Sequence, residues 1–285
     1  MGINTVRAFL ETQVEDLCAT TELGVETIRR IRKDFERLLE VRVSQVQHQS
    51  TGITSLDDFL GGGLRVGHIY EICGRIGTGK SKFCHTIALK LAQQGIGCLY
   101  VDMNGDLVPA LMRKLLVDMG EPPEELQRIL SLIRIDKVWN LSDLKPMLKF
   151  IASNKEALDA FGLLIMDSLA ILHVVRFDKK KEKFSENVTM IRECYKLLHE
   201  IAKIGNFTVI LTNLLISHED DSKITPGSFN IGLQLNEIIP FLPFTRLRID
   251  ATDEKSSRRE ISVLTSNHLD MNAKVSLQLT HKGFI

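Results

Sequence analysis

One eight-residue segment restricts the fold of this chain more than any other feature. It reads Gly74-Arg75-Ile76-Gly77-Thr78-Gly79-Lys80-Ser81. The apolar run 69–73 comes directly before it, and apolar residues at helical spacing follow it at Phe83, Cys84, Ile87, Ala88 and Leu91. A strand, a glycine-rich turn and a helix in this order are typical of a loop that binds phosphate groups. A glycine-rich turn with an ordinary exposed lysine is the alternative, and the flanking elements favour the phosphate-binding loop.

The residue types in the loop predict how ATP and a magnesium ion would be held. The glycines let backbone N–H groups point at phosphate oxygens, and the helix N-terminus adds partial positive charge. We expect the ATP contacts to come from Gly74, Gly77, Thr78, Gly79, Lys80 and Ser81. Lys80 would reach the β and γ phosphates, while the Ser81 hydroxyl and Asp167, which ends the apolar run 163–167, would hold Mg²⁺. Lys80 and Asp167 are therefore the candidate catalytic residues; for Asp167, capping of the next helix is the alternative.

The pattern around the loop predicts an α/β fold. Apolar runs at 69–73, 98–102, 132–135, 163–167 and 207–212 alternate with helical patterns at 81–94, 107–119, 142–154 and 185–204. This alternation indicates a mainly parallel sheet with helices on both faces. After Asn213 the pattern changes to strands at 244–250, 259–264 and 274–279, joined by polar turns, so we expect C-terminal antiparallel strands.

The N-terminal part of the chain has a different pattern. Apolar residues recur at helical spacing up to about residue 43, and the polar stretch 44–50 follows without periodicity. We expect a small helical N-terminal domain at 1–43, a linker at 44–50 and the ATP-binding core at 51–285. In the N-terminal domain Arg29, Arg30, Arg32, Lys33, Arg37 and Arg42 form a basic stripe, which is either a binding surface or a solvated helix face.

Composition narrows the classes of protein. Thirty-six Lys and Arg balance thirty-six Asp and Glu, so any contact with DNA must come from local patches. The five cysteines are scattered and lack metal-ligand spacing, which favours reduced thiols in the cytosol or nucleus. No stretch reaches the roughly 18 apolar residues of a membrane span, and we expect a soluble intracellular protein.

Several segments together resemble the RecA-like recombinase superfamily. They are 51–64 (TGITSLDDFLGGGL), the phosphate loop, 99–105 (LYVDMNG), 163–168 (LLIMDS) and 209–213 (VILTN). The resemblance runs from about Thr51 to the C-terminus, and within the superfamily the chain is most similar to the D-type paralogue of the eukaryotic strand-exchange recombinase. It implies a RecA-like core behind a small helical domain, and a role in homologous recombination within a complex of paralogues that assists the main recombinase on single-stranded DNA. It also implies a nuclear location.

The departures from the family pattern bear on mechanism. Active recombinases carry a glutamate that activates water where this chain has Asn104, and an amide does not take a proton from water. The glutamine that senses the γ-phosphate falls at Leu214, and the adenine-stacking arginine falls near Leu111, with Arg113 two residues on. The Phe-x-x-Ala motif of recombinase polymerisation is not visible between Val41 and Ser50, so a defined hetero-oligomer is expected instead of a long homofilament.

Two loops of this superfamily face DNA. The first would span about Arg176 to Ser185 and is basic, with Arg176, Lys179, Lys180, Lys181 and Lys183 as candidate DNA contacts. A solvated loop is an equally good interpretation. The second, about Ser217 to Gly232, has three acidic residues against one lysine. Three functions therefore stay open: a recombination mediator that uses ATP as a slow switch, a DNA-stimulated RecA-type ATPase, and a scaffold with a vestigial site.

Overall fold

The computed structural model describes residues 14–21, 23–44, 46–168, 181–204, 207–214, 244–253 and 256–285, together with Phe9 and Thr12. Its contacts divide the chain into two units, Met1–Gln47 and His48–Ile285. We describe each unit by itself. The expected domain bounds stay a prediction, although the expected linker does contain structure, because a short strand β1 (His48–Gln49) pairs antiparallel with β2 (Leu64–Arg65).

The N-terminal unit is helical. Helix α2 (Val14–Thr21) and helix α3 (Val25–Ser44) flank Gly24, and Leu17 and Ile28 are fully buried between them. One arginine of the predicted basic stripe is used inside the unit, because the Arg32 guanidinium donates to the backbone carbonyls of Phe9 and Thr12. At Arg32, at least, the basic stripe is therefore not a solvated helix face.

The second unit is built on a nine-stranded sheet in the order β11-β10-β9-β8-β3-β7-β6-β4-β5 within the described residues. The strands are β3 (Ile69–Gly74), β4 (Cys98–Asp102), β5 (Ile133–Lys137), β6 (Leu163–Asp167), β7 (Thr208–Leu214), β8 (Phe244–Ala251), β9 (Arg258–Thr265), β10 (Lys274–Thr280) and β11 (Gly283–Phe284). Strands β3 to β8 pair parallel with one another, and β9, β10 and β11 continue the sheet antiparallel. The predicted parallel sheet with an antiparallel C-terminal part is confirmed.

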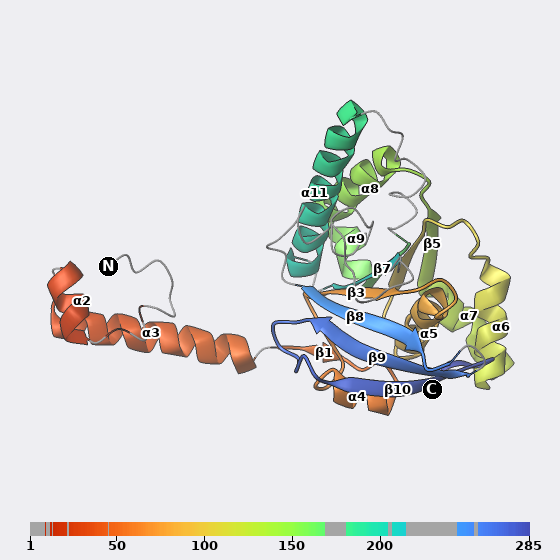
Figure 1. Cartoon of the computed structure of the whole chain (residues 1–285), viewed down its shortest axis with the longest axis horizontal. Coiled ribbons are helices and arrows are strands. Elements are labelled where there is room, and N and C mark those ends of the chain that lie inside the picture. The colour runs from red at the N-terminus through yellow and green to blue at the C-terminus, as the bar shows by residue number, and fades with distance from the viewer. Residues whose placement is uncertain are drawn as a thin grey trace. The chain divides into compact units, whose positions relative to one another are not determined.

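Helices cover both faces of this sheet (Figure 1). One apolar core joins it to α4 (Thr54–Phe59), α5 (Lys80–Gln93), α6 (Pro109–Met119) and α7 (Pro123–Ser131). The other joins it to α8 (Leu141–Ser153) and α11 (Lys181–Ile204); a short helix α9 (Lys155–Ala160) follows α8. Adjacent residues of β3 serve opposite faces, since Tyr70 and Ile72 belong to the first core and Ile69 to the second. This is the three-layer arrangement that the alternating pattern predicts.

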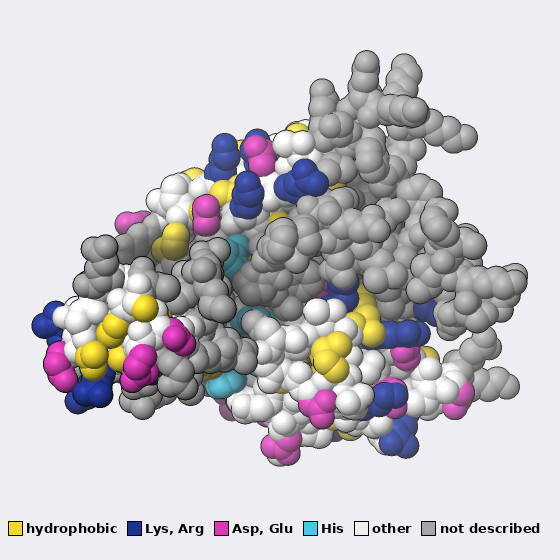
Figure 2. Space-filling model, turned by 60° about the vertical axis from the view of Figure 1, so that its left-hand side comes forward, with side chains coloured by type: hydrophobic (Ala, Val, Ile, Leu, Met, Phe, Trp, Pro, Cys, Tyr) yellow, Lys and Arg dark blue, Asp and Glu magenta, His cyan; other side chains and the backbone are white. Residues whose placement is uncertain are grey.

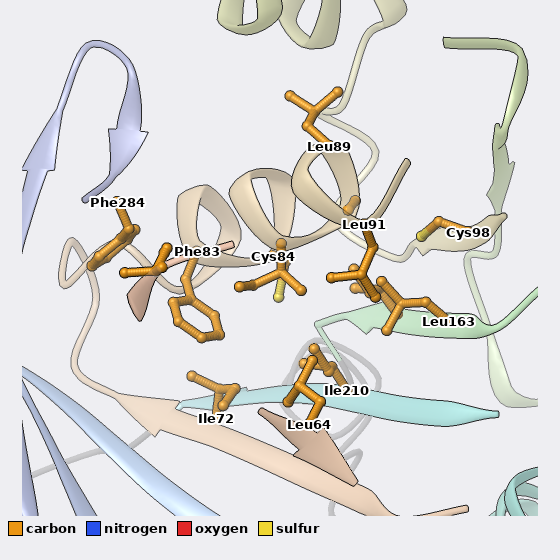
Figure 3. Close-up of a cluster of buried hydrophobic side chains, with 14 of the residues drawn as sticks. Leu64, Ile72, Phe83, Cys84, Leu89, Leu91, Cys98, Leu163, Ile210 and Phe284 are labelled. Atoms are coloured by element: carbon orange, nitrogen blue, oxygen red, sulfur yellow. The ribbon is translucent and has the colours of Figure 1, made fainter. Parts of the chain in front are cut away.

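Helix α5 follows the glycine-rich loop and lies across the first face of the sheet. Figure 3 shows Phe83 and Cys84 of this helix pointing toward Ile72 and Ile210 of the sheet, and Phe83, Cys84, Ile72 and Ile210 are each at most 2% exposed. This packing anchors the helix whose first residue is Lys80. Because β3, β7, β6 and β4 run parallel to one another, their carboxyl ends meet at one edge of the sheet, beside the loop.

Two further expectations concern the thiols and membranes. The cysteines are free thiols, and four of them (Cys73, Cys84, Cys98 and Cys194) are buried, as the scattered spacing predicts. In the part of the chain that the structure describes, no helix combines the length and the apolar character that crossing a membrane requires.

Candidate phosphate-binding site

The loop has the backbone geometry that its glycines predict. Gly74 ends β3, Gly77 and Gly79 have φ angles of 81° and 99°, and α5 begins at Lys80. Such positive φ angles strain any residue with a Cβ atom, so glycine is required at both positions. The first turn of α5 has backbone N–H groups without partners inside the helix, which makes this end of the helix suited to an anion.

Close packing on the outer side of the loop adds a second requirement for glycine. A Cβ atom on Gly74 would lie 2.4 Å from the carbonyl oxygen of Ile249, and one on Gly79 would lie 3.0 Å from Leu279 Cδ2. Both neighbours come from the C-terminal strands β8 and β10. The loop is therefore held between the helix that it starts and strands that lie about 170 to 200 residues later in the chain.

The Lys80 ammonium lies inside the curve of the loop. Its Nζ donates to the carbonyl oxygens of Gly74 at 2.9 Å and Arg75 at 2.8 Å. Burial lowers the pKa of Lys80, while the negative charge of Asp167 acts in the opposite direction. The cation is thus placed where it would meet an anion bound by the loop.

Asp167 ends β6 and is 3% exposed. Its carboxylate accepts hydrogen bonds from the Tyr100 hydroxyl at 2.7 Å and the Thr212 hydroxyl at 2.6 Å. Burial and the Asp167 charge together raise the pKa of Tyr100 well above its usual range. These two donors come from the neighbouring strands β4 and β7, so they fix the Asp167 carboxylate at the edge of the sheet beside the loop. Ser81, the other predicted magnesium ligand, lies half-buried in the first turn of α5.

The segment with Asn104 is shaped by another carboxylate. Asp102 accepts hydrogen bonds from the backbone N–H groups of Asn104 at 3.1 Å, Gly105 at 2.8 Å and Leu107 at 3.0 Å. Of the two roles that its position suggests, a magnesium-ordering one and a structural one, the contacts favour the structural one. Trp139, which sequence reasoning did not single out, lies against Gly105, where a Cβ atom would come within 2.1 Å of the indole.

A buried ion pair lies beneath the end of β7 and was also missed from the sequence. Glu71 accepts from Arg246 Nε at 2.6 Å and from Asn213 Nδ2 at 2.8 Å. Glu71 and Arg246 are 2% and 3% exposed. The pair orients Asn213, the residue before Leu214 at the expected glutamine position. The sequence does contain a signal that could have predicted this pair. Glu71 stands in an otherwise apolar strand, and Arg246 stands in another strand far along the chain.

A histidine cluster lies at the opposite end of β3. His68 Nε2 and the Thr245 hydroxyl are 3.0 Å apart, and the His68 and His268 rings are edge to face with centroids 4.8 Å apart. Burial, followed by the nearness of His268 and Arg65, lowers the pKa of His68 to about 3. Burial also lowers the pKa of His268, to about 4, so both imidazoles are neutral near pH 7; neither was predicted as a site residue from the sequence.

The remaining predicted residues are only partly described. Leu111 and Arg113 lie exposed on α6. Arg176, Lys179, Lys180 and the second DNA loop, 217–232, lie outside the described residues. Lys181 and Lys183 belong to α11, so the end of the first predicted loop is helical; their side chains lie outside the description. On the face that Figure 2 shows, basic and acidic side chains are interspersed over the described surface.

Comparison with known proteins places the geometry in a family context. The Rad51 family model matches residues 42–284. The DNA repair and recombination protein RadA of Metallosphaera sedula is 23% identical over 99% of this chain and 89% of its own length. The DNA repair protein RAD51 homolog 4 of Bos taurus is 27% identical over 73% of this chain, which spans 63% of the bovine protein. The DNA repair and recombination protein RadB of Thermoplasma acidophilum is 26% identical over 79% of this chain and 94% of its own length.

Proposed function

Because this chain belongs to the Rad51 family of RecA-like recombinases, we propose that it is an ATP-binding recombinase paralogue that acts in DNA double-strand-break repair by homologous recombination. The observation that carries the proposal is the loop that joins β3 to α5, with Lys80 inside its curve and Asp167 at the adjacent edge of the sheet. The similarity to the D-type paralogue agrees with the matches to RAD51 homolog 4 of Bos taurus and Mus musculus.

The residues present fit a nucleotide and its metal ion. Gly74 leaves no space for a Cβ atom against the Ile249 carbonyl oxygen, and Gly77 and Gly79 have positive φ angles, so glycines keep the loop in the curved backbone conformation that phosphate oxygens need. Lys80 would pair with the β and γ phosphates, and Ser81 and Asp167 would hold Mg²⁺ directly or through water. The bound ion would neutralise phosphate charge, and the Tyr100 and Thr212 hydroxyls would hold the Asp167 carboxylate oriented.

We propose that ATP acts as a slow assembly switch. Asn104 at the usual glutamate position is not a general base, and its backbone is held by Asp102. Leu214 at the usual glutamine position has no side-chain hydrogen-bonding group. Binding of ATP is supported by the loop, whereas rapid hydrolysis lacks its usual groups in this chain.

The proposed partners are other recombinase paralogues, the main recombinase and single-stranded DNA, and the proposed location is the nucleus. The names of the relatives, which refer to DNA repair and recombination, support a role in this process. The lysine-rich segment from Arg176 to Lys183 stays a proposed DNA contact.

Co-expression with paralogues tests the proposal. Wild type and Lys80→Ala are purified by a tag on the partner, with and without ATP, and the exposed Lys114→Ala on α6 serves as the matched control. We expect the wild type and Lys114→Ala to co-purify with the partner only when ATP is present. Lys80→Ala should fail to co-purify even with ATP. Assembly that ignores both ATP and Lys80 supports the scaffold instead. Turnover that single-stranded DNA strongly stimulates, and that Lys80→Ala abolishes, supports the RecA-type ATPase.

A further inference from the structure

An arginine from the C-terminal part of the sheet reaches the phosphate loop. Arg259, in β9, donates through Nε to the carbonyl oxygen of Thr78 at 3.0 Å, across 181 positions of sequence. The same guanidinium donates through Nη1 to the carbonyl oxygens of Ser256 at 2.6 Å and Arg258 at 3.0 Å. Those two contacts fix the guanidinium plane, so that its Nε–H is presented to the loop from a rigid position.

The contact with Thr78 determines the direction of the next N–H group. In a planar trans peptide, the C=O and N–H bonds point in opposite directions. Because the Thr78 carbonyl is turned to Arg259, the N–H of Gly79 points away from Arg259, which is the direction in which a phosphate bound by the loop would lie. Gly79 is the N-cap of α5, with a φ angle of 99°. Without a donor on the outer side, this peptide plane is freer to rotate, and the N–H loses its orientation toward an anion.

The last strands of the chain hold the same part of the loop by packing. A Cβ atom on Gly79 would be 3.0 Å from Leu279 Cδ2 and 3.3 Å from Phe284 Cζ. The Phe284 ring lies edge to face with Phe83, with centroids 5.5 Å apart (Figure 3). The Phe284 N–H donates to Thr86 Oγ1 at 3.2 Å. Leu279 and Phe284 thus pack against the loop and the first turns of α5, and Arg259 adds a charge-assisted hydrogen bond to the loop from the same part of the sheet.

We propose that Arg259 is a positioning residue for phosphate binding: it acts through the Thr78–Gly79 peptide and does not itself contact the nucleotide. The inference deepens the proposed function and rests on nucleotide binding at this loop. It assigns the antiparallel C-terminal strands a role in the nucleotide site, because the conformation of the loop depends on them.

Nucleotide affinity provides the first test. The dissociation constant of Mg·ADP is measured by calorimetry for wild type, Arg259→Gln and Arg258→Gln. Arg258 is the matched control, because its exposed guanidinium donates to Ser276 Oγ at 3.1 Å and, among the residues that the structure describes, has no hydrogen bond with the loop. Because Arg259→Gln removes a hydrogen bond from a charged donor, it should weaken binding about tenfold or more, and Arg258→Gln should weaken it about twofold at most. Arg259→Lys, which keeps a cationic donor, should recover most of the lost affinity.

Hydrogen exchange without nucleotide provides the second test and separates the two proposals. Exchange of the peptide that spans Gly74 to Lys80 should be faster in Arg259→Gln than in wild type and unchanged in Arg258→Gln, while far-ultraviolet circular dichroism stays the same for all three. If the wild type binds no nucleotide, the proposed function fails, and the exchange result still decides the role of Arg259. The role is overturned if Arg259→Gln matches the wild type in loop exchange, or if it binds Mg·ADP as tightly as Arg258→Gln does.

Discussion

Replacement of Glu71 by alanine should cost about 3 to 5 kcal/mol of unfolding free energy, because it removes one partner of a buried ion pair. Arg246 Nε lies 2.6 Å from Glu71 Oε2, and the two residues are 3% and 2% exposed. Asn213 Nδ2 would lose its acceptor at 2.8 Å in the same change. Because both side chains are almost fully buried, the guanidinium loses its charged acceptor away from solvent, and part of its desolvation cost then falls on the folded state.

Urea unfolding measures this cost as the shift in midpoint multiplied by the slope of the transition. The matched control is Glu260→Ala, which breaks an exposed pair with Lys274 of similar length, 2.9 Å, and should cost about 1 kcal/mol or less. In Glu71→Ala/Arg246→Ala the two losses should be clearly less than additive. Equal costs for the buried and the exposed carboxylate, or additive losses in the double variant, would refute the reasoning.

Three further changes test other parts of the core. The neutral His68 stabilises the fold fully above the unfolded pKa of 6.5, and this contribution is lost as pH falls toward the folded pKa of about 3. The pKa of His268, lowered to about 4, acts in the same direction in wild type and variant, so urea unfolding should reveal a loss between pH 7 and pH 5 that is about 2 kcal/mol smaller in His68→Gln than in wild type. Gly105→Ala should cost about 1 kcal/mol because φ is 80°, and it should shift the emission of Trp139, the single tryptophan, whose indole occupies the space of the new Cβ. Asp102→Asn should lower the free energy of unfolding, measured by thermal denaturation, by about 1 to 3 kcal/mol. The Asp102 carboxylate accepts hydrogen bonds from three backbone N–H groups with two oxygens, and the amide that replaces it has one oxygen.

The sequence predicts the architecture well because short buried strands and amphipathic helices have different periods. The predicted run 163–167 coincides with β6, and 98–102 coincides with β4. Helix α7 was not predicted, because it is short and follows α6 after a turn of a few residues. Pro122 and Pro123 in this turn were not interpreted as the start of a second helix. Helix α9 is also too short for its periodicity to stand out.

The local chemistry of the loop was readable for a similar reason. Gly77 and Gly79 occupy positive φ angles, and the residues that follow start a helix, so the sequence carries the geometry within a few residues. Contacts between distant segments carry no such local signal. Arg259 meets Thr78 only because β8 lies beside β3 in the sheet, and the partner of Glu71 depends on the same pairing. These contacts require the strand order, which the spacing of motifs does not specify.

The central claim is that the loop from Gly74 to Ser81 binds ATP through Lys80. Calorimetry with Mg·ATP on purified wild type and Lys80→Ala, each alone and with its co-expressed paralogues, tests it most directly. We predict saturable binding of one ATP per chain in the wild type, and a loss of at least about tenfold in affinity in Lys80→Ala with an unchanged circular dichroism spectrum. Equal affinity in the two proteins, or no binding by the wild type in either setting, would contradict the account.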